Sequence, residues 1–207
     1  MKRISKSWMK ALRFSLVLLV LCGILYPLAL TGVSQLLFPK QANGSLIEVN
    51  GKVIGSTLIG QNFEDNRFLQ GRPSAVNYNT YETQAEAEST APASGSSNYA
   101  PSNDELLVRM EADLNQFLSE NPGLTASDVP VDLLAASASG LDPDISVEAA
   151  MVQVERIAQA SGLSNDEVKA IIESHIHEPV LGVIGNHAVN VLAVNLELAQ
   201  KLGLLKD

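Results

Sequence analysis

The chain has 207 residues, a formal net charge of −9 and one cysteine, Cys22. A single cysteine excludes an intrachain disulfide, so packing must stabilise the fold. All 23 acidic residues follow position 38, and with nine basic residues they give 39–207 a net charge of −14. Such a surface repels phosphates, which argues against nucleic acid as a partner.

The segment Phe14 to Phe38 contains 25 residues and no charged side chain. At about 1.5 Å per residue a helix of this length extends about 37 Å, enough to cross a hydrocarbon core of about 30 Å. Residues 1–13 contain five basic and no acidic residues, which is typical of a cytoplasmic flank. We therefore expect a cytoplasmic tail at 1–13, a transmembrane helix at 14–38 in membrane lipid, and an extracytoplasmic domain at 39–207 on the plasma (inner) membrane.

A cleaved signal peptide shares this pattern but has a shorter apolar core, of about 7–15 residues, and a cleavage site flanked by small residues. Ala29-Leu30-Thr31 is a poor site of that kind. Lipoprotein processing at Cys22 is disfavoured because Leu21, which is not small, precedes it. We favour a retained helix.

The helix carries a stripe of small or weakly polar residues within about 80° of one another at about 100° per residue. Its members are Gly23, Pro27, Thr31 and Ser34. Small residues let helices approach closely in lipid, so the stripe is a candidate interface with a partner helix. A lone anchor that tolerates a proline explains the pattern equally well.

Beyond the helix, residues 46–49 and 52–59 flank Asn50-Gly51, a pair that favours the type I′ turn of a β-hairpin. Residues 77–101 are polar, acidic and then rich in Ala, Ser and Gly. This composition predicts a long exposed loop within the domain.

Three amphipathic helices follow, each with recognisable start and stop signals. They are predicted from Ser102, in a capping box with Glu105, to Asn121; from a cap at Ser146 to Gly162; and from Ser164, in a capping box with Glu167, to about Ile176. Short strands are expected at 131–135 and 189–194, and a closing helix at 195–202. Helices and strands without a βαβ repeat predict an α+β domain behind the single transmembrane helix.

The chain lacks the motifs that would support catalysis by itself. It contains no G-x-x-x-x-G-K-[ST] loop, no G-x-S-x-G elbow and no Asp-Lys-Thr-Gly sequence, so we predict no catalytic residues. His175, His177, His187 and Glu178 are the candidates for a metal site. The close histidine pair would point about 200° apart on a helix, so we predict no metal site, with His175 at a helix end.

Two loops of small residues each precede a capped helix: Gly95-Ser96-Ser97-Asn98 and Ser139 to Pro143. Backbone amides at a helix start bind anions, although the same residues serve ordinary capping more often. Arg72 lies between Gly71 and Pro73. It suits either an ion pair inside the domain or a contact with a partner.

Several blocks of sequence stand out when they are taken together: Tyr26-Pro27, Phe68 to Ser74, Ala93 to Asn98 with Pro101 to Asn103, Pro130 to Leu133, Ser139 to Ser146, Leu181-Gly182, Val189 to Leu192 and Asn195-Leu196. In this order they resemble one family, the KdpC subunit of the Kdp potassium-transporting P-type ATPase. Ala138 stands where the family usually has glycine, and Asp144 where histidine is frequent.

The resemblance implies a non-catalytic accessory subunit of a high-affinity potassium uptake pump. Its implied partners are a channel-like potassium-translocating subunit, a P-type ATPase subunit that carries the catalysis, and a small hydrophobic subunit. The family is described as a catalytic chaperone that aids ATP binding by the catalytic subunit. Gly95, Ser96, Ser97 and Asn98 are then the candidate nucleotide or partner contact.

These implications conflict with the charge pattern, because ATP is cytoplasmic and the basic tail places the acidic domain outside. We expect no tightly bound cofactor, with ATP reaching this subunit only through the complex. The alternative function is a membrane-anchored extracytoplasmic hydrolase or metal enzyme. That function would need histidine, serine and carboxylate groups converging in a deep pocket.

Overall fold

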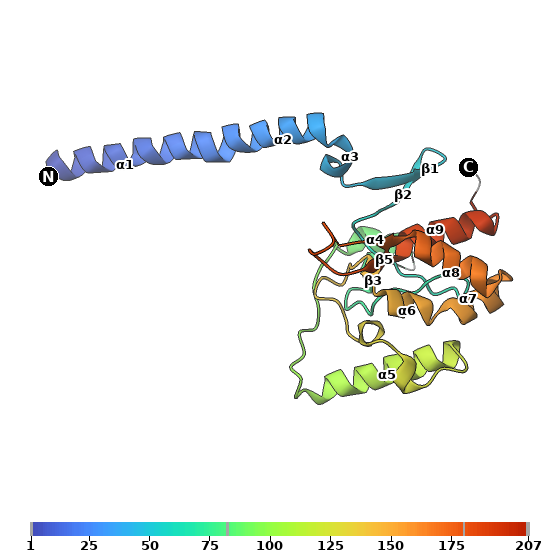
Figure 1. Cartoon of the computed structure of the whole chain (residues 1–207). Coiled ribbons are helices and arrows are strands. Elements are labelled where there is room, and N and C mark those ends of the chain that lie inside the picture. The colour runs from blue at the N-terminus through green and yellow to red at the C-terminus, as the bar shows by residue number, and fades with distance from the viewer. Residues whose placement is uncertain (1, 82, 180, 206–207) are drawn as a thin grey trace. The chain divides into compact units, whose positions relative to one another are not determined.

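The structure, a computed structural model, describes residues 2–81, 83–179 and 181–205. It contains two compact units, Met1–Leu46 and Ile47–Asp207, shown in Figure 1. The first unit holds α1 (Lys2–Val20), a π-helical turn (Leu21–Leu25), α2 (Tyr26–Leu37) and α3 (Pro39–Ala42). The second holds most of β1 (Leu46–Val49), then β2 (Lys52–Ser56), α4 (Gln84–Ser89), α5 (Asp104–Glu120), β3 (Asp144–Ile145), α6 (Val147–Met151), α7 (Val154–Ser161), α8 (Asn165–Ser174), β4 (Ile176–His177), β5 (Ala188–Asn190) and α9 (Val191–Lys201).

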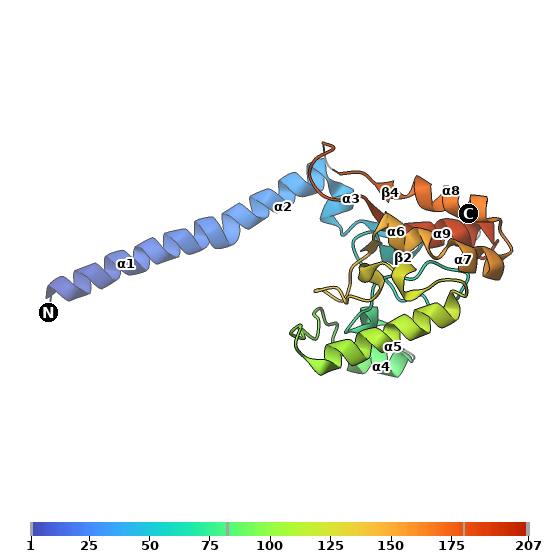
Figure 2. The same cartoon turned by 60° about the horizontal axis from the view of Figure 1, so that its bottom comes forward.

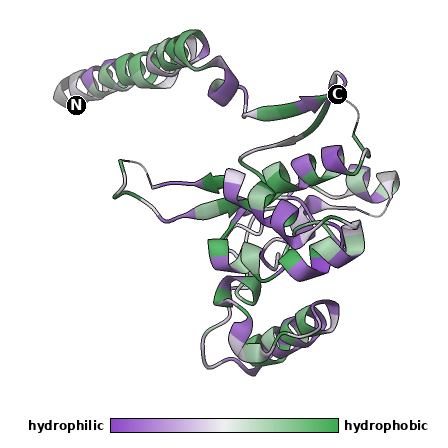
Figure 3. Cartoon of the chain, turned by 45° about the vertical axis from the view of Figure 1, so that its right-hand side comes forward, coloured by the Kyte–Doolittle hydropathy of each residue, from purple (hydrophilic) through white to green (hydrophobic). Residues whose placement is uncertain are grey.

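Among the described residues, one helix is long and apolar enough to cross a membrane, and it spans Ser7–Leu37. Figure 3 shows its hydrophobic residues continuing through α1 and α2. The helix is interrupted where Pro27 lacks an N–H group and its ring would clash with the carbonyl of Gly23. A π turn absorbs that clash, and Tyr26 N–H donates to the carbonyl of Leu21, five residues earlier. The anchor predicted at 14–38 is thus a helix throughout, apart from its last residue.

The π turn changes the predicted stripe of small residues. Pro27, Thr31 and Ser34 lie in the regular helix α2 and share one face, but Gly23 lies inside the π turn. Because a π turn holds more residues per turn than an α-helix, the spacing of 100° per residue does not apply to Gly23. The Thr31 hydroxyl donates to the carbonyl of Pro27 at 2.8 Å, so the helix itself satisfies it.

The second unit begins with the predicted hairpin. Asn50 and Gly51 have φ angles of 54° and 74°, as a type I′ turn requires, and β1 pairs with β2. The second strand is shorter than predicted, ending at Ser56 rather than Ile59 because the chain turns back, with a single bridge between these two residues.

A three-stranded antiparallel sheet of order β3-β5-β4 organises the core. Val189 on the central strand faces Ile145 on one side and Ile176 on the other. Helices α6 to α9 surround this sheet (Figure 2). Helix α5 lies apart from them, with irregular segments of the chain in between. The largest fully buried apolar side chains are Leu69, Ile157, Ile172, Leu198, Val168, Val189 and Val194. The domain is α+β, as predicted.

The caps decide where the helices begin and end. Ser146 caps α6, Gly162 ends α7 at a φ of 79°, and the Ser164–Glu167 capping box opens α8, all as predicted. The predicted second helix is, however, two helices, α6 and α7, with a turn at Gln153 between them. The buried side chain of Gln153 makes hydrogen bonds to the backbone of Gln70. The helix predicted from a Ser102 box instead begins after Asn103, whose side chain accepts the N–H of Glu105.

Three other predictions were wrong in detail. The loop at 77–101 contains a short left-handed turn at Asn77–Asn79 and the helix α4. The strand predicted at 131–135 is instead a 3₁₀ turn at Val131–Leu133, in which the N–H of Leu133 donates to the carbonyl of Pro130 and the side chain of Leu133 is buried. The apolar run 189–194 is a strand only to Asn190, whose side chain accepts the N–H of Ala193 and so starts α9.

Candidate functional site

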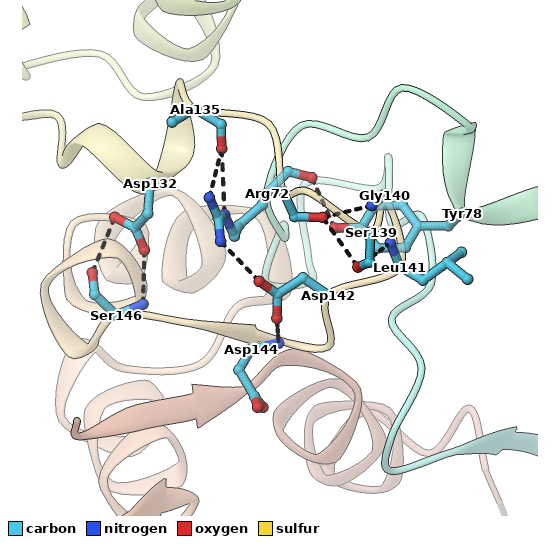
Figure 4. A network of polar contacts seen from close by, with 11 residues as sticks. Arg72, Tyr78, Asp132, Ala135, Ser139, Gly140, Leu141, Asp142, Asp144 and Ser146 are labelled. Atoms are coloured by element: carbon cyan, nitrogen blue, oxygen red, sulfur yellow. Dashed lines mark hydrogen bonds and ion pairs between the residues drawn. The ribbon is translucent and has the colours of Figure 1, made fainter. Parts of the chain in front are cut away.

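Arg72 lies at the centre of a polar network beside the loop Ser139 to Pro143 (Figure 4). Its side chain is 25% exposed, and Nη1 donates to Asp142 Oδ2 at 2.8 Å. Nε and Nη2 both donate to the carbonyl of Ala135, at 3.3 and 3.0 Å. Of the two roles predicted for Arg72, the structure shows the ion pair inside the domain. The planar guanidinium suits this task because it binds two acceptors at fixed angles.

Tyr78 closes the network from the opposite side. Its hydroxyl donates to the carbonyl of Arg72 at 2.8 Å, and its ring packs so closely on Gly60 that an added Cβ would lie 2.5 Å from Cε1. Burial, together with the nearby Asp142 carboxylate, raises the pKa of Tyr78 to about 12, because both disfavour a second negative charge. Tyr78 is therefore a neutral hydrogen-bond donor that fixes the backbone at Arg72.

The two small-residue loops are joined to each other. The N–H of Gly95 and the hydroxyl of Ser94 both donate to the carbonyl of Ser139, at 2.7 and 3.0 Å. Ser74 links the Arg72 segment to the same place, because its hydroxyl donates to the carbonyl of Gly140 at 2.6 Å. Sequence spacing alone did not indicate this contact between loops 45 residues apart.

The predicted contact residues Ser96, Ser97 and Asn98 line a hollow of about 590 Å³ between this junction and α5. Gly95, the fourth of these residues, is not part of the lining, and its N–H donates to the carbonyl of Ser139. Within the loop, Ser96 Oγ donates to Asn98 Oδ1 at 2.9 Å and accepts the N–H of Asn98. The loop thus satisfies part of its own polar groups.

Arg109 on α5 lines the same hollow, and the sequence reading missed it because helix periodicity alone does not place it opposite the loop. Arg109 is already engaged: Nη1 donates to Asp113 Oδ2 at 2.5 Å and Nη2 to the carbonyl of Leu134 at 3.1 Å. Burial raises the pKa of Asp113, while Arg109 opposes that shift. Since Arg109 and Asp113 are the charged residues of the lining, the hollow offers no excess positive charge to a phosphate.

Side-chain amides hold the segment that leads into Arg72. Asn195 accepts the N–H of Leu69 at 2.7 Å and donates to its carbonyl at 2.8 Å. Gln153 makes the same pair of bonds with Gln70, at 2.9 and 3.1 Å. These two amides therefore replace the neighbouring strand that this buried, irregular backbone lacks.

Arg156 supports the same segment from inside the domain, where it is 4% exposed. It donates to the carbonyls of Asn66 and Phe68 and to the side chains of Asn121 and Gln153. Burial lowers the pKa of Arg156 to about 10, which leaves it charged at neutral pH. Its role is structural, because its donors are taken up by groups of the domain.

The histidines predicted as metal candidates do not converge. His175 ends α8, as predicted, and its Nε2 lies 2.9 Å from Glu197 Oε2. His187 Nδ1 lies 3.1 Å from Glu178 Oε2 at the surface. Among the residues that the structure describes, no three His, Cys, Asp or Glu side chains are placed to hold a metal ion.

The fold and the site together define an α+β protein with one apolar helix of membrane-spanning length, in which Arg72 holds one of two joined loops. The sequence matches the protein family described as "KdpC: K+-transporting ATPase, c chain" over residues 8–200. The Potassium-transporting ATPase KdpC subunit of Clostridium kluyveri is 54% identical over 192 residues, 92% of this chain and 91% of the relative. The same subunit of Clostridioides difficile is 48% identical over 207 residues, 97% of this chain and 100% of the relative.

This chain therefore belongs to the KdpC family of potassium-transporting ATPase subunits. The resemblance drawn from the sequence blocks around Arg72 and the two loops is confirmed. Potassium transport by an ATPase complex is thus its functional setting.

Proposed function

We propose that the chain is a non-catalytic accessory subunit of the potassium-transporting ATPase, required for assembly and full activity of the complex. ATP hydrolysis and ion passage belong, in this proposal, to the P-type ATPase subunit and the channel-like subunit, with a small hydrophobic subunit beside them. One observation carries it: the charged groups of the candidate site pair with each other, Arg72 with Asp142 and Arg109 with Asp113. Paired charges build a rigid surface rather than a reactive centre.

The helix Ser7–Leu37 supports assembly in the membrane. Its large side chains are exposed along its whole length, and in lipid close helix contacts form where small residues lie. The face of Pro27, Thr31 and Ser34 is the proposed contact with a partner helix.

We also propose that the domain lies on the extracytoplasmic side, because the five basic residues precede the span. From that side the acidic domain attracts cations toward the complex and has no access to cytoplasmic ATP. A membrane-impermeant thiol reagent tests this on Ala91→Cys, an exposed position, in a Cys22→Ala background. Labelling of intact cells is expected, whereas labelling only after lysis would reverse the topology.

A second function, promotion of ATP binding by direct contact, is favoured by one observation. The hollow beside Ser96, Ser97 and Asn98 contains Arg109 and is large enough, at about 590 Å³, for a small molecule. The pairing of Arg109 with Asp113 weighs against a triphosphate there. We favour a role in which any effect on ATP binding passes through the assembled complex.

Calorimetry and a hydrolysis assay on the purified full-length chain separate these functions. The accessory role predicts no ATP hydrolysis and no tight binding of Mg-ATP by the chain alone. Submicromolar binding that Arg109→Ala abolishes would establish direct nucleotide contact. Hydrolysis of ATP or of ester substrates by the isolated chain would instead support the alternative of a membrane-anchored hydrolase.

A further inference from the structure

The loop between β4 and β5 exposes large aliphatic side chains. Leu181 is 86% exposed, Val183 81% and Ile184 63%. Positive φ angles at Leu181, Gly182 and Gly185 turn the backbone sharply here, and the loop leaves the helices that surround the sheet (Figures 1 and 2). Aliphatic side chains so far exposed add little to the core, and clustered exposure of this kind marks a contact surface.

This apolar tip is also free of charge. No ionisable residue lies between Pro179 and Asn186, although the domain carries a net charge of −14. The charged residues stand at its base, where His187 Nδ1 lies 3.1 Å from Glu178 Oε2. The tip can therefore approach an anionic surface that repels the rest of the domain.

The base of this loop lies on the side of the domain where the chain enters from the anchor. Ile47, the first residue of the second unit, lines a hollow together with His175, the residue just before β4. Eight residues, 38–45, separate the end of α2 from β1. Even fully extended they reach only about 30 Å at about 3.5 Å per residue, so the segment that tethers the domain to the helix is short.

We infer that the tip formed by Leu181, Val183 and Ile184 inserts into the interface of the same bilayer that the helix crosses. The anchor holds the domain at a high effective concentration beside the lipid, so shallow insertion of a few aliphatic side chains is sufficient for contact. A protein partner is the weaker match. The tip contains no Trp, Tyr or Arg, the residues that dominate the binding energy of protein interfaces.

The inference is tested on the full-length chain alone, in phosphatidylcholine nanodiscs. In a Cys22→Ala background, Val183→Cys is labelled with an environment-sensitive fluorophore, and lipids carrying a nitroxide near the headgroup are added. Matched labels on Leu36→Cys in the helix and Ala91→Cys on an exposed loop are the positive and negative controls. We expect a blue shift and quenching at position 183 comparable with those at position 36, and neither at position 91.

A second variant separates a loss of lipid contact from a loss of folding. Val183→Asp/Ile184→Asp with the label on Leu181→Cys should lose the quenching while circular dichroism stays unchanged. Quenching at position 36 but not at 183 would overturn the inference. Protection of position 183 only in the assembled ATPase, and not in lipid alone, would also overturn it in favour of a protein partner. Because the test uses the chain without partners, its failure leaves the proposed accessory function intact.

Discussion

Arg72 receives its role from groups that are distant in the sequence. Asp142 and the carbonyl of Ala135 lie 70 and 63 residues away, yet both bond the one guanidinium. Gly71 and Pro73 indicated a rigid setting for a cation, but local sequence cannot name such partners. The arginine joins the segment after Leu69 to the loop before β3, and we expect the stability of the domain to depend on these bonds.

Replacing Arg72 should therefore destabilise the domain. Arg72→Ala leaves Asp142 and the Ala135 carbonyl without partners, at a cost of about 1–3 kcal/mol for half-buried polar groups. Arg72→Lys should lie between Ala and wild type, since an ammonium lacks the fork that serves both acceptors. Urea unfolding of the detergent-solubilised chain, followed by circular dichroism, measures the difference. Equal stability of all three proteins would show that the ion pair contributes nothing.

Tyr78 makes stability depend on pH in the alkaline range. Its pKa rises from 10.0 to about 12 in the folded domain, so folding favours the neutral phenol. That contribution is complete below pH 10, falls as the unfolded chain ionises above 10, and is lost by about pH 12. Comparing melting temperatures of wild type and Tyr78→Phe between these values isolates the effect. The gap should close as the pH rises, and a constant gap would contradict the raised pKa of Tyr78 and the burial that causes it.

At the scale of elements, local signals were accurate wherever one short segment decides the structure. Asn50-Gly51, Ser146, Gly162 and the Ser164 box all lie at the predicted ends of elements. Predictions failed where a distant contact competes. The second helix breaks at Gln153, whose side chain serves the backbone of Gln70, 83 residues away.

The candidate site shows the same division. The small-residue loops were visible in the sequence, but their junction through Ser139 was not, and neither was Arg109 on the far wall of the hollow. Pairing between loops depends on how α5 and the core place them. No periodicity in either segment encodes that arrangement.

The junction of these loops predicts a difference between two glycines of the same backbone conformation. Gly140 has a φ of 67°, and a Cβ there would lie 2.7 Å from Val76 Cγ2 and 2.8 Å from the carbonyl of Gly95. Gly162 has a φ of 79° and nothing within 4 Å. Gly162→Ala should cost only backbone strain, whereas Gly140→Ala adds a steric clash and should be destabilised by a further 1–3 kcal/mol or so. Thermal unfolding of the two variants tests this, and equal losses would mean that the loops are not packed together.

At the scale of the whole molecule, one apolar helix and one acidic domain divide the work. The helix can be predicted because a run of 25 uncharged, mostly apolar residues is typical of a membrane span. Its π turn, just before Pro27, was not predicted and is seen only in the structure. The domain contributes a surface on which the two arginines of the candidate site, Arg72 and Arg109, are each paired with an aspartate. We therefore propose that the protein acts by contacting the other subunits of the complex and not by catalysing a reaction itself.

The measurement that tests this account most directly is potassium-stimulated ATP hydrolysis by the assembled ATPase. One complex contains the full chain, and the other contains a chain cut after residue 46, which keeps the anchor. The account predicts that both complexes assemble, that the second loses much of its potassium-stimulated hydrolysis, and that the full chain alone hydrolyses no ATP. Undiminished hydrolysis without residues 47–207, or ATP hydrolysis by the chain alone, would contradict it.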